Sequence, residues 1–294
     1  MMVLQSFTML PASCKEERGT HFVNSSILQT AHIFGSNVSG MSSTLKRFAL
    51  FALIARTSAS RNRSIHFESN RIMNTNSSDS QTIACVGDSL TVGSGSSGHR
   101  YVNAYPAVLK KDAFFAEYNV HNYGLGGMCA TKSIDRFSYW DTKQYQDAMK
   151  CQPSIVIIMF GTNDAKYNNW NEVLFREDYI SLIKGFQELP TKPAIYLIIP
   201  PPMYTDSGPY NISGPTVNYK LPEIIPEIAK HCNVKVIDGF NALGGISLNF
   251  PEAYMIDSNK AAGHPPNDMC HLNNLGYAKI AGAVAQFLQA DEDI

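Results

Sequence analysis

Ser89 is the first residue along the chain whose type and setting could do covalent chemistry. It lies in the run from Gly87 to Leu90, directly after a short apolar stretch. A hydroxyl at such a turn is exposed, and its own backbone N–H can point toward the same pocket. A serine in this setting can act as the nucleophile of acyl transfer when a base activates it. Alone it is weak evidence, because an ordinary Gly/Ser turn has the same composition.

Two better-known motifs are excluded around Ser89. The Gly-x-Ser-x-Gly elbow requires a glycine two residues after the serine, and Thr91 stands there instead. A phosphate-binding loop requires a following Gly-Lys-Ser or Gly-Lys-Thr, which this segment lacks. Whether Ser89 is a nucleophile therefore depends on the other candidate catalytic residues of the chain.

Two further segments could stabilise negative charge. Glycines in residues 122–128 let the backbone approach a ligand and offer N–H groups. Asn163, in the run from Gly161 to Asp164, offers a side-chain N–H that a tetrahedral oxyanion would need. Each segment also has a purely structural interpretation. The first could be a tight turn, and the second could cap a helix, a role that Asp164 could fill equally well.

Near the C-terminus, Asp268 precedes His271 by three residues. In a turn approaching helical geometry, residues three apart share a face, so the carboxylate could hold the imidazole in one tautomer. That is the support a general base needs. The alternative is a capping aspartate beside a solvated histidine. His264 is the rival base, and we prefer His271 because only His271 has an aspartate three residues before it.

The elements that must position these residues form a repeating pattern. Short apolar runs, rich in β-branched residues, predict buried strands at 83–86, 118–123, 154–160, 194–199 and 234–237. Helical spacing or start signals predict helices at 105–111, 135–150, 171–189 and 221–231, and a last helix beginning just after residue 271.

Strands that alternate with helices predict an α/β fold, a three-layer α/β/α sandwich around a roughly five-stranded parallel sheet. In such sheets ligands bind outside the carboxyl ends of the strands. Ser89, the glycine segment and Asn163 each follow a predicted strand. We therefore expect them to meet at one edge of the sheet, and the conjunction with the Asp268 to His271 pair outweighs each structural alternative.

In this order the four segments resemble the blocks of the GDSL, or SGNH, hydrolases, in which Ser, Gly, Asn and His stand in separate segments. The resemblance covers about Thr82 to the C-terminus. It implies an SGNH, flavodoxin-like sandwich and a carboxylic ester hydrolase that works through an acyl-enzyme intermediate. No metal and no cofactor are expected.

The resemblance also implies a role for each site residue. Ser89 would be the nucleophile, with His271 as general base and acid and Asp268 as its orienting partner. The oxyanion hole would comprise the N–H groups of Ser89 and Gly127 with the side chain of Asn163. Gly127 is preferred to its neighbour because the family pattern places this glycine five residues after an asparagine.

Within the family, the carbohydrate-esterase or sialate O-acetylesterase-like branch is the most similar. It implies removal of short acyl groups, above all acetyl, from a carbohydrate. Two departures, Cys129 where relatives often carry Thr and Leu272 where Pro is usual, affect loop shape and substrate contacts but remove no catalytic atom. Two alternatives stay open: a lysophospholipase or thioesterase-type lipid esterase, whose apolar channel residues 239–267 could build, and a glycan-binding module with an unused site.

The amino-acid composition limits the classes of partner and substrate that the protein could bind. The 294 residues carry 24 basic and 25 acidic side chains, a formal net charge of −1, so no global field attracts nucleic acid. Six scattered cysteines lack the short spacing of metal sites. No apolar run reaches the roughly 18 to 20 residues of an integral membrane segment. A small-molecule or glycan ester is the expected substrate, and the oligomeric state stays open.

The chain is predicted to have two parts. Residues 1–80 mix Ser, Asn, Thr and Arg with little periodicity and are expected to be a leader or linker, disordered or a targeting segment. Residues 81–294 form the expected catalytic domain. Residues 41–60 resemble a secretory signal if translation begins at Met41. A secreted or endomembrane location and a soluble intracellular one therefore both stay open.

Overall fold

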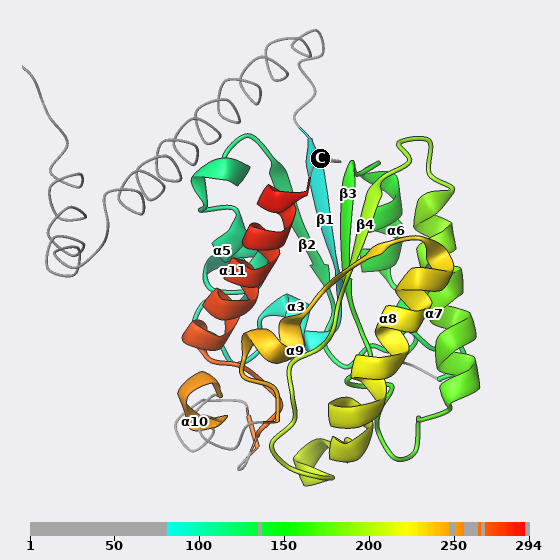
Figure 1. The fold of residues 1–294 in the computed structure, drawn as a ribbon, viewed down its shortest axis with the longest axis vertical. Helices are drawn as coiled ribbons and strands as arrows, with labels where there is room; N and C mark the ends of the chain where they lie inside the picture. Colours follow the sequence, from blue (N-terminus) through cyan, green and yellow to red (C-terminus); the bar gives the residue numbers. More distant parts are fainter. Residues whose placement is uncertain (1–80, 135–136, 247–250, 256–263, 266–267, 292–294) are drawn as a thin grey trace, which may run out of the picture. The chain divides into compact units, whose positions relative to one another are not determined.

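A computed structural model describes residues 81–134, 137–246, 251–255, 264–265 and 268–291 (Figure 1). The expected leader or linker, residues 1–80, lies outside the described residues, as does much of the segment 239–267 that was considered for an apolar channel. No helix within the described ranges is long and apolar enough to cross a membrane.

Five parallel strands form one sheet, as the sequence predicts. They are β1 (Thr82–Gly87), β2 (Asn119–Gly124), β3 (Ile155–Met159), β4 (Ala194–Ile198) and β5 (Lys235–Ile237). Their order is β2-β1-β3-β4-β5. The chain leaves β1 for one side of the sheet and then returns to the other, so the strand order reverses between β1 and β3. Ligand crevices of doubly wound sheets lie at this switch point, and the segments of Ser89 and Asn163 follow these two strands.

Alternate residues of the central strands enter two separate cores. Cys85 and Ile157 belong to one, while Val86 and Ile158 belong to the other. This period of two explains why each strand is apolar throughout, since both faces of the sheet are covered.

Five helices cover the two faces of the sheet, as the α/β/α prediction requires. They are α5 (Tyr105–Leu109), α6 (Lys143–Lys150), α7 (Glu172–Gln187), α8 (Leu221–Cys232) and α11 (Asn274–Ala290). Figure 1 shows α5 and α11 on one side of the strands and α7 and α8 on the other. Residues of α5 and α11 join the first core, and residues of α6, α7 and α8 join the second.

Shorter elements fill the connections. Four are one-turn α-helices, α3 (Ser89–Val92), α4 (His99–Val102), α9 (Gly239–Ala242) and α10 (Pro251–Tyr254). Three are 3₁₀ turns, Ala113–Phe115, Tyr139–Asp141 and Gly208–Tyr210, and a π-helical turn, Thr216–Lys220, leads into α8.

Two helix starts differ from the prediction. The helix expected from residue 135 begins only at Lys143, because the side chain of Thr142 accepts the N–H of Tyr145 and caps it there. The last helix begins at Asn274, where the side chain of Asn273 accepts two N–H groups of the first turn. His271 therefore lies in the turn that precedes this helix and not within the helix.

Gly87 ends β1 at a point with no room for a side chain. A Cβ there would lie 2.2 Å from Thr91 Oγ1 and 2.5 Å from the carbonyl oxygen of Met159. We expect Gly87→Ala to lower the free energy of unfolding by about 3 kcal/mol, since the strand and α3 would have to separate. The matched control is Gly282→Ala in α11, where nothing lies within 4 Å of the new Cβ. Urea unfolding of both variants gives the comparison, and equal stabilities would contradict the close approach at Gly87.

Candidate active site

Ser89 is the first residue of α3, immediately after β1. Asp88 caps this turn, since its Oδ1 accepts the N–H of Leu90 at 2.8 Å. The cap fixes the direction in which the chain leaves the strand. Ser89 therefore lies at the carboxyl edge of the sheet, as the sequence predicts.

His271 and Asp268 meet Ser89 in an unbroken line of contacts. The Nε2 atom of His271 lies 2.8 Å from Ser89 Oγ, and its Nδ1 atom lies 2.7 Å from Asp268 Oδ2. Asp268 is fully buried, and His271 is nearly so. The three residues that the sequence singled out from segments 182 residues apart are thus in hydrogen-bond contact. A nucleophile, a base and an orienting carboxylate require this geometry.

The turn from Asp268 to His271 holds its own carboxylate. Asp268 Oδ1 accepts the backbone N–H groups of Cys270 and His271, each at 3.0 Å. Burial acts to raise the pKa of Asp268, but its hydrogen bonds with His271 and the charge of that ring together hold the pKa well below the ordinary value. The carboxylate is therefore ionised and can orient His271.

The glycine segment and Asn163 lie next to Ser89. Gly127 has φ +81°, a conformation that favours glycine, and a Cβ on Gly126 would meet only Ser89 Cβ, at 3.8 Å. The side-chain nitrogen of Asn163 donates to Asp88 Oδ2 at 3.2 Å and to the carbonyl oxygen of Met128 at 3.3 Å. Both contacts are long, so an oxyanion would compete effectively for one of these N–H groups.

Two buried carboxylates support this edge of the sheet. Asp164 accepts the N–H and the hydroxyl of Thr131 and the N–H of Ala130, which ties the loop after β2 to the loop after β3. The alternative that Asp164 caps the following helix is wrong, because Asn171 caps α7. Burial raises the pKa of Asp88 to about 7 and also raises that of Asp164. Asp88 contacts the N–H of Leu90 and the side chain of Asn163, which gives it a structural role at this edge.

Two thiols near the site are poor rivals to the serine. Cys129 and Cys270 are buried, and burial raises the pKa of each thiol above its ordinary value. A nucleophilic cysteine needs the opposite shift, because the thiolate is the reactive form. Both are free thiols.

Tyr210 and His264 contact the site in a way that sequence reasoning missed. The hydroxyl of Tyr210 donates to Asp268 Oδ2 at 2.8 Å, and His264 Nδ1 lies 2.8 Å from the same oxygen. His264, the rival base, thus faces the carboxylate, while the imidazole on Ser89 is that of His271. The Tyr210 contact depends on the packing of separate loops, since 58 residues separate it from Asp268, whereas the spacing of four residues between His264 and Asp268 could have indicated the other contact.

Among the described residues, His264, Asp268 and His271 form a group whose ligand atoms could approach a metal ion, since these atoms lie within 4.8 Å of one another. Their N–O separations of 2.7 and 2.8 Å are those of hydrogen bonds, which account for the cluster without an ion. The expectation of no metal and no cofactor stays a prediction.

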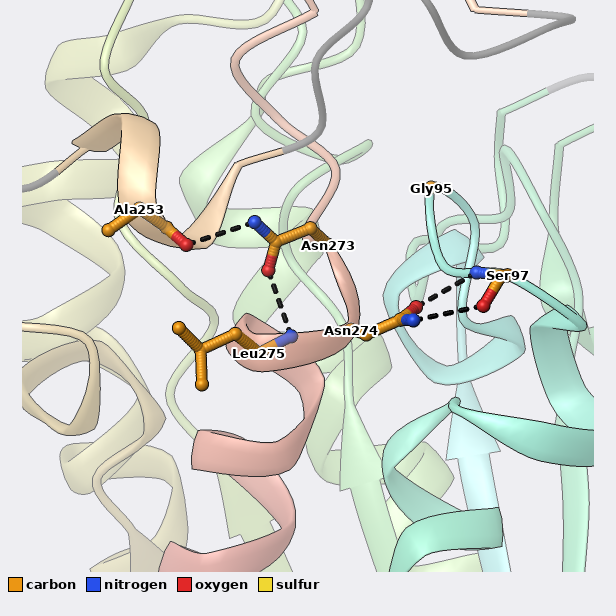
Figure 2. A pocket seen from close by; sticks show the side chains of 6 residues that line it. All are labelled: Gly95, Ser97, Ala253, Asn273, Asn274 and Leu275. Carbon is orange, nitrogen blue, oxygen red and sulfur yellow. Dashed lines mark hydrogen bonds between the residues drawn. The ribbon is translucent and has the colours of Figure 1, made fainter. Parts of the chain in front are cut away.

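A shallow pocket of about 470 Å³ lies between the loop after Ser89 and the turn after His271 (Figure 2). It is lined by Gly95, Ser97, Ala253, Asn273, Asn274 and Leu275. The amide of Asn274 binds the N–H and the hydroxyl of Ser97, each at 2.9 Å, and Asn273 donates to the carbonyl of Ala253. Both amides are engaged with the protein: that of Asn274 joins the loop after Ser89 to the turn after His271, and that of Asn273 joins the same turn to α10.

Comparison with known proteins adds to this geometry. The model of the GDSL-like Lipase/Acylhydrolase family matches residues 85–279. An acetylxylan esterase of Xylanibacter ruminicola is 28% identical in an alignment of 225 residues that covers 70% of this chain and 43% of that protein. The chain thus matches less than half the length of this relative.

Solved structures show a similar fold. A lipase/acylhydrolase from Enterococcus faecalis superposes with a TM-score of 0.50 at 23% identity, over 71% of this chain and 95% of that one. A carbohydrate acetylesterase from Sinorhizobium meliloti superposes with a TM-score of 0.52 at 17% identity, over 71% and 99%. At these identities the likeness concerns the fold alone.

Proposed function

The chain belongs to the GDSL-like lipase/acylhydrolase family, a family of ester hydrolases, and on that premise we propose that it removes short acyl groups, above all acetyl, from a carbohydrate. The observation that carries the proposal is the unbroken contact from Ser89 Oγ through His271 to the buried Asp268 carboxylate. The proposed roles are those expected from the sequence.

In the acylation step Ser89 Oγ forms a bond to the carbonyl carbon of the ester while its proton passes to His271 Nε2. Asp268 accepts Nδ1–H of the imidazole, which keeps Nε2 free to take that proton and stabilises the resulting imidazolium. The bond from the carbonyl carbon to the alcohol oxygen then breaks, and His271 returns its proton to the leaving alcohol. The product is an acyl ester on Ser89.

The oxyanion of each tetrahedral intermediate is held by donors at the sheet edge. We assign these to the N–H groups of Ser89 and Gly127 and to the side chain of Asn163. Asp88 fixes the amide of Asn163 through its contact at 3.2 Å, which supports a preorganised donor. In deacylation the oxygen of a water attacks the acyl carbon while a proton of that water passes to His271. The bond from the acyl carbon to Ser89 Oγ then breaks, His271 returns the proton to Oγ, and the carboxylic acid leaves.

The acetyl and carbohydrate parts of the proposal rest on the similarity to the acetylxylan esterase. Because the shared segment is less than half of that protein, its substrate is carried over only as part of this proposal.

Acyl preference tests the proposal. We expect kcat/KM for p-nitrophenyl acetate to exceed that for the octanoate by about tenfold or more, since a site that fits acetyl has no room for a long chain. We also expect release of acetate from acetylated xylo-oligosaccharides. The measurements are initial rates on the ester series and acetate release by the same preparation.

Each alternative predicts a different result. A preference for octanoate or for a lysophospholipid would replace the carbohydrate assignment with a lipid esterase. Binding of xylo-oligosaccharides without hydrolysis of any ester would favour a glycan-binding module with an unused site.

A further inference from the structure

The Asp268 carboxylate accepts more hydrogen bonds than a triad requires. Its Oδ1 atom accepts the two backbone N–H groups of its own turn. Its Oδ2 atom is approached by three side-chain atoms, His271 Nδ1 at 2.7 Å, His264 Nδ1 at 2.8 Å and Tyr210 Oη at 2.8 Å. A carboxylate offers about four lone-pair positions, two on each oxygen, so the three donors at Oδ2 share its positions, and together the five contacts oppose rotation of the carboxylate.

The two additional side chains also enclose His271. The ring of Tyr210 meets the imidazole edge to face, with centroids 5.3 Å apart, and the ring of His264 lies 5.2 Å from it. Tyr210 comes from the loop after β4, and His264 from the segment before the Asp268 turn. Two separate loops thus converge on one carboxylate oxygen and one imidazole.

The chemistry of these contacts fixes the hydrogen positions. An ionised carboxylate only accepts, so Tyr210 and both Nδ1 atoms must donate to it. His264 therefore carries its proton on Nδ1, as His271 does, and both imidazoles share one anion. His264 cannot act on Ser89 from this position, because the contact to Ser89 Oγ is made by His271.

We propose that His264 and Tyr210 are positioning residues, which lock Asp268 Oδ2 so that the carboxylate holds His271 in line with Ser89. This inference rests on the proposed function of the same site. Neither residue contacts Ser89 Oγ, so each acts through the Asp268 carboxylate and the His271 ring against which it packs. Their loss changes the orientation of the base and leaves the oxyanion donors and substrate contacts in place, so kcat falls while KM changes little.

The test compares two substitutions of His264. His264→Asn keeps an N–H donor close to the position of Nδ1, whereas His264→Leu removes it. For p-nitrophenyl acetate we expect His264→Leu to lower kcat about tenfold with KM within about twofold, and His264→Asn to restore most of the loss. His231→Leu, at an exposed histidine of α8, is the control and is expected to match wild type.

A second variant and a second readout keep the inference independent of folding and of activity. Tyr210→Phe removes only one oxygen and is expected to lower kcat with KM unchanged, so it decides the question if His264→Leu does not fold.

Proton NMR follows the downfield Nδ1–H resonance of His271, which we expect to shift in His264→Leu and to return in His264→Asn. Wild-type kcat in both His264→Leu and Tyr210→Phe, with an unmoved resonance, would overturn the inference. If the wild-type protein hydrolysed no ester, the proposed function would be overturned instead, and the NMR comparison would still test the positioning role of His264.

Discussion

Ser89→Ala is expected to lower kcat for p-nitrophenyl acetate by about 10⁴-fold or more, while the protein stays folded. The reason is that the acyl-enzyme forms on Ser89 Oγ, which lies 2.8 Å from the base, and alanine leaves no atom to attack the ester. The residual rate would come from the oxyanion donors and from substrate binding, which do not depend on the hydroxyl. Steady-state kinetics and circular dichroism on the same sample measure the loss and the fold.

A matched control separates loss of the nucleophile from loss of any serine. Ser181→Ala removes a hydroxyl that bonds only the preceding turn of α7. We expect it to hydrolyse the ester at the wild-type rate. Equal rates in Ser89→Ala and wild type would refute the assignment of Ser89 as the nucleophile.

His271→Ala is expected to cause a loss of similar size, about 10⁴-fold or more in kcat. Without the imidazole, Ser89 keeps its proton at neutral pH, and the leaving alcohol receives none. Since the serine and the histidine act as one unit, the double variant Ser89→Ala/His271→Ala should lose no more than either single variant. The kinetics of the three variants on one ester make this measurement.

The two histidines of the site provide the critical contrast. His264 and His271 both contact Asp268 Oδ2, yet only His271 faces Ser89. We expect kcat to fall about tenfold on loss of the His264 imidazole and about 10⁴-fold or more on loss of the His271 imidazole. Losses of the same size in the two variants would contradict the separation into a positioning residue and a base. Additive losses of kcat in Ser89→Ala/His271→Ala would contradict the interpretation that the serine and the histidine act as one unit.

The strands could be predicted because burial on both faces leaves a clear pattern in the sequence. β3 is buried at every residue and appears as the unbroken run from Ile155 to Met159. β2 lies at the edge of the sheet, and only Gly124 among its residues is fully buried, so its apolar signal is weaker. The helix predicted from residue 135 fails at its start, because the cap at Thr142 depends on a preceding turn that has no periodicity.

The residues of the candidate site could be predicted because each stands beside an element with a strong local signal. Ser89 and Asn163 follow buried strands, and the pair Asp268 and His271 lies within one turn. The contact of Tyr210 with Asp268 could not be predicted in this way, since 58 residues separate them and only tertiary packing joins their loops. The same holds for Asp164, whose bonds to Thr131 span 33 residues.

The central claim is that Ser89 is the nucleophile of an acyl-enzyme mechanism, and covalent labelling tests it most directly. The folded protein is treated with a fluorophosphonate, an electrophile that activated serines attack, and the labelled peptide is identified by mass spectrometry. The account predicts one adduct, on the peptide that bears Ser89, and its disappearance in Ser89→Ala and in His271→Ala. Labelling of Ser94, Ser96 or Ser97 instead, or an adduct that persists in Ser89→Ala, would contradict it.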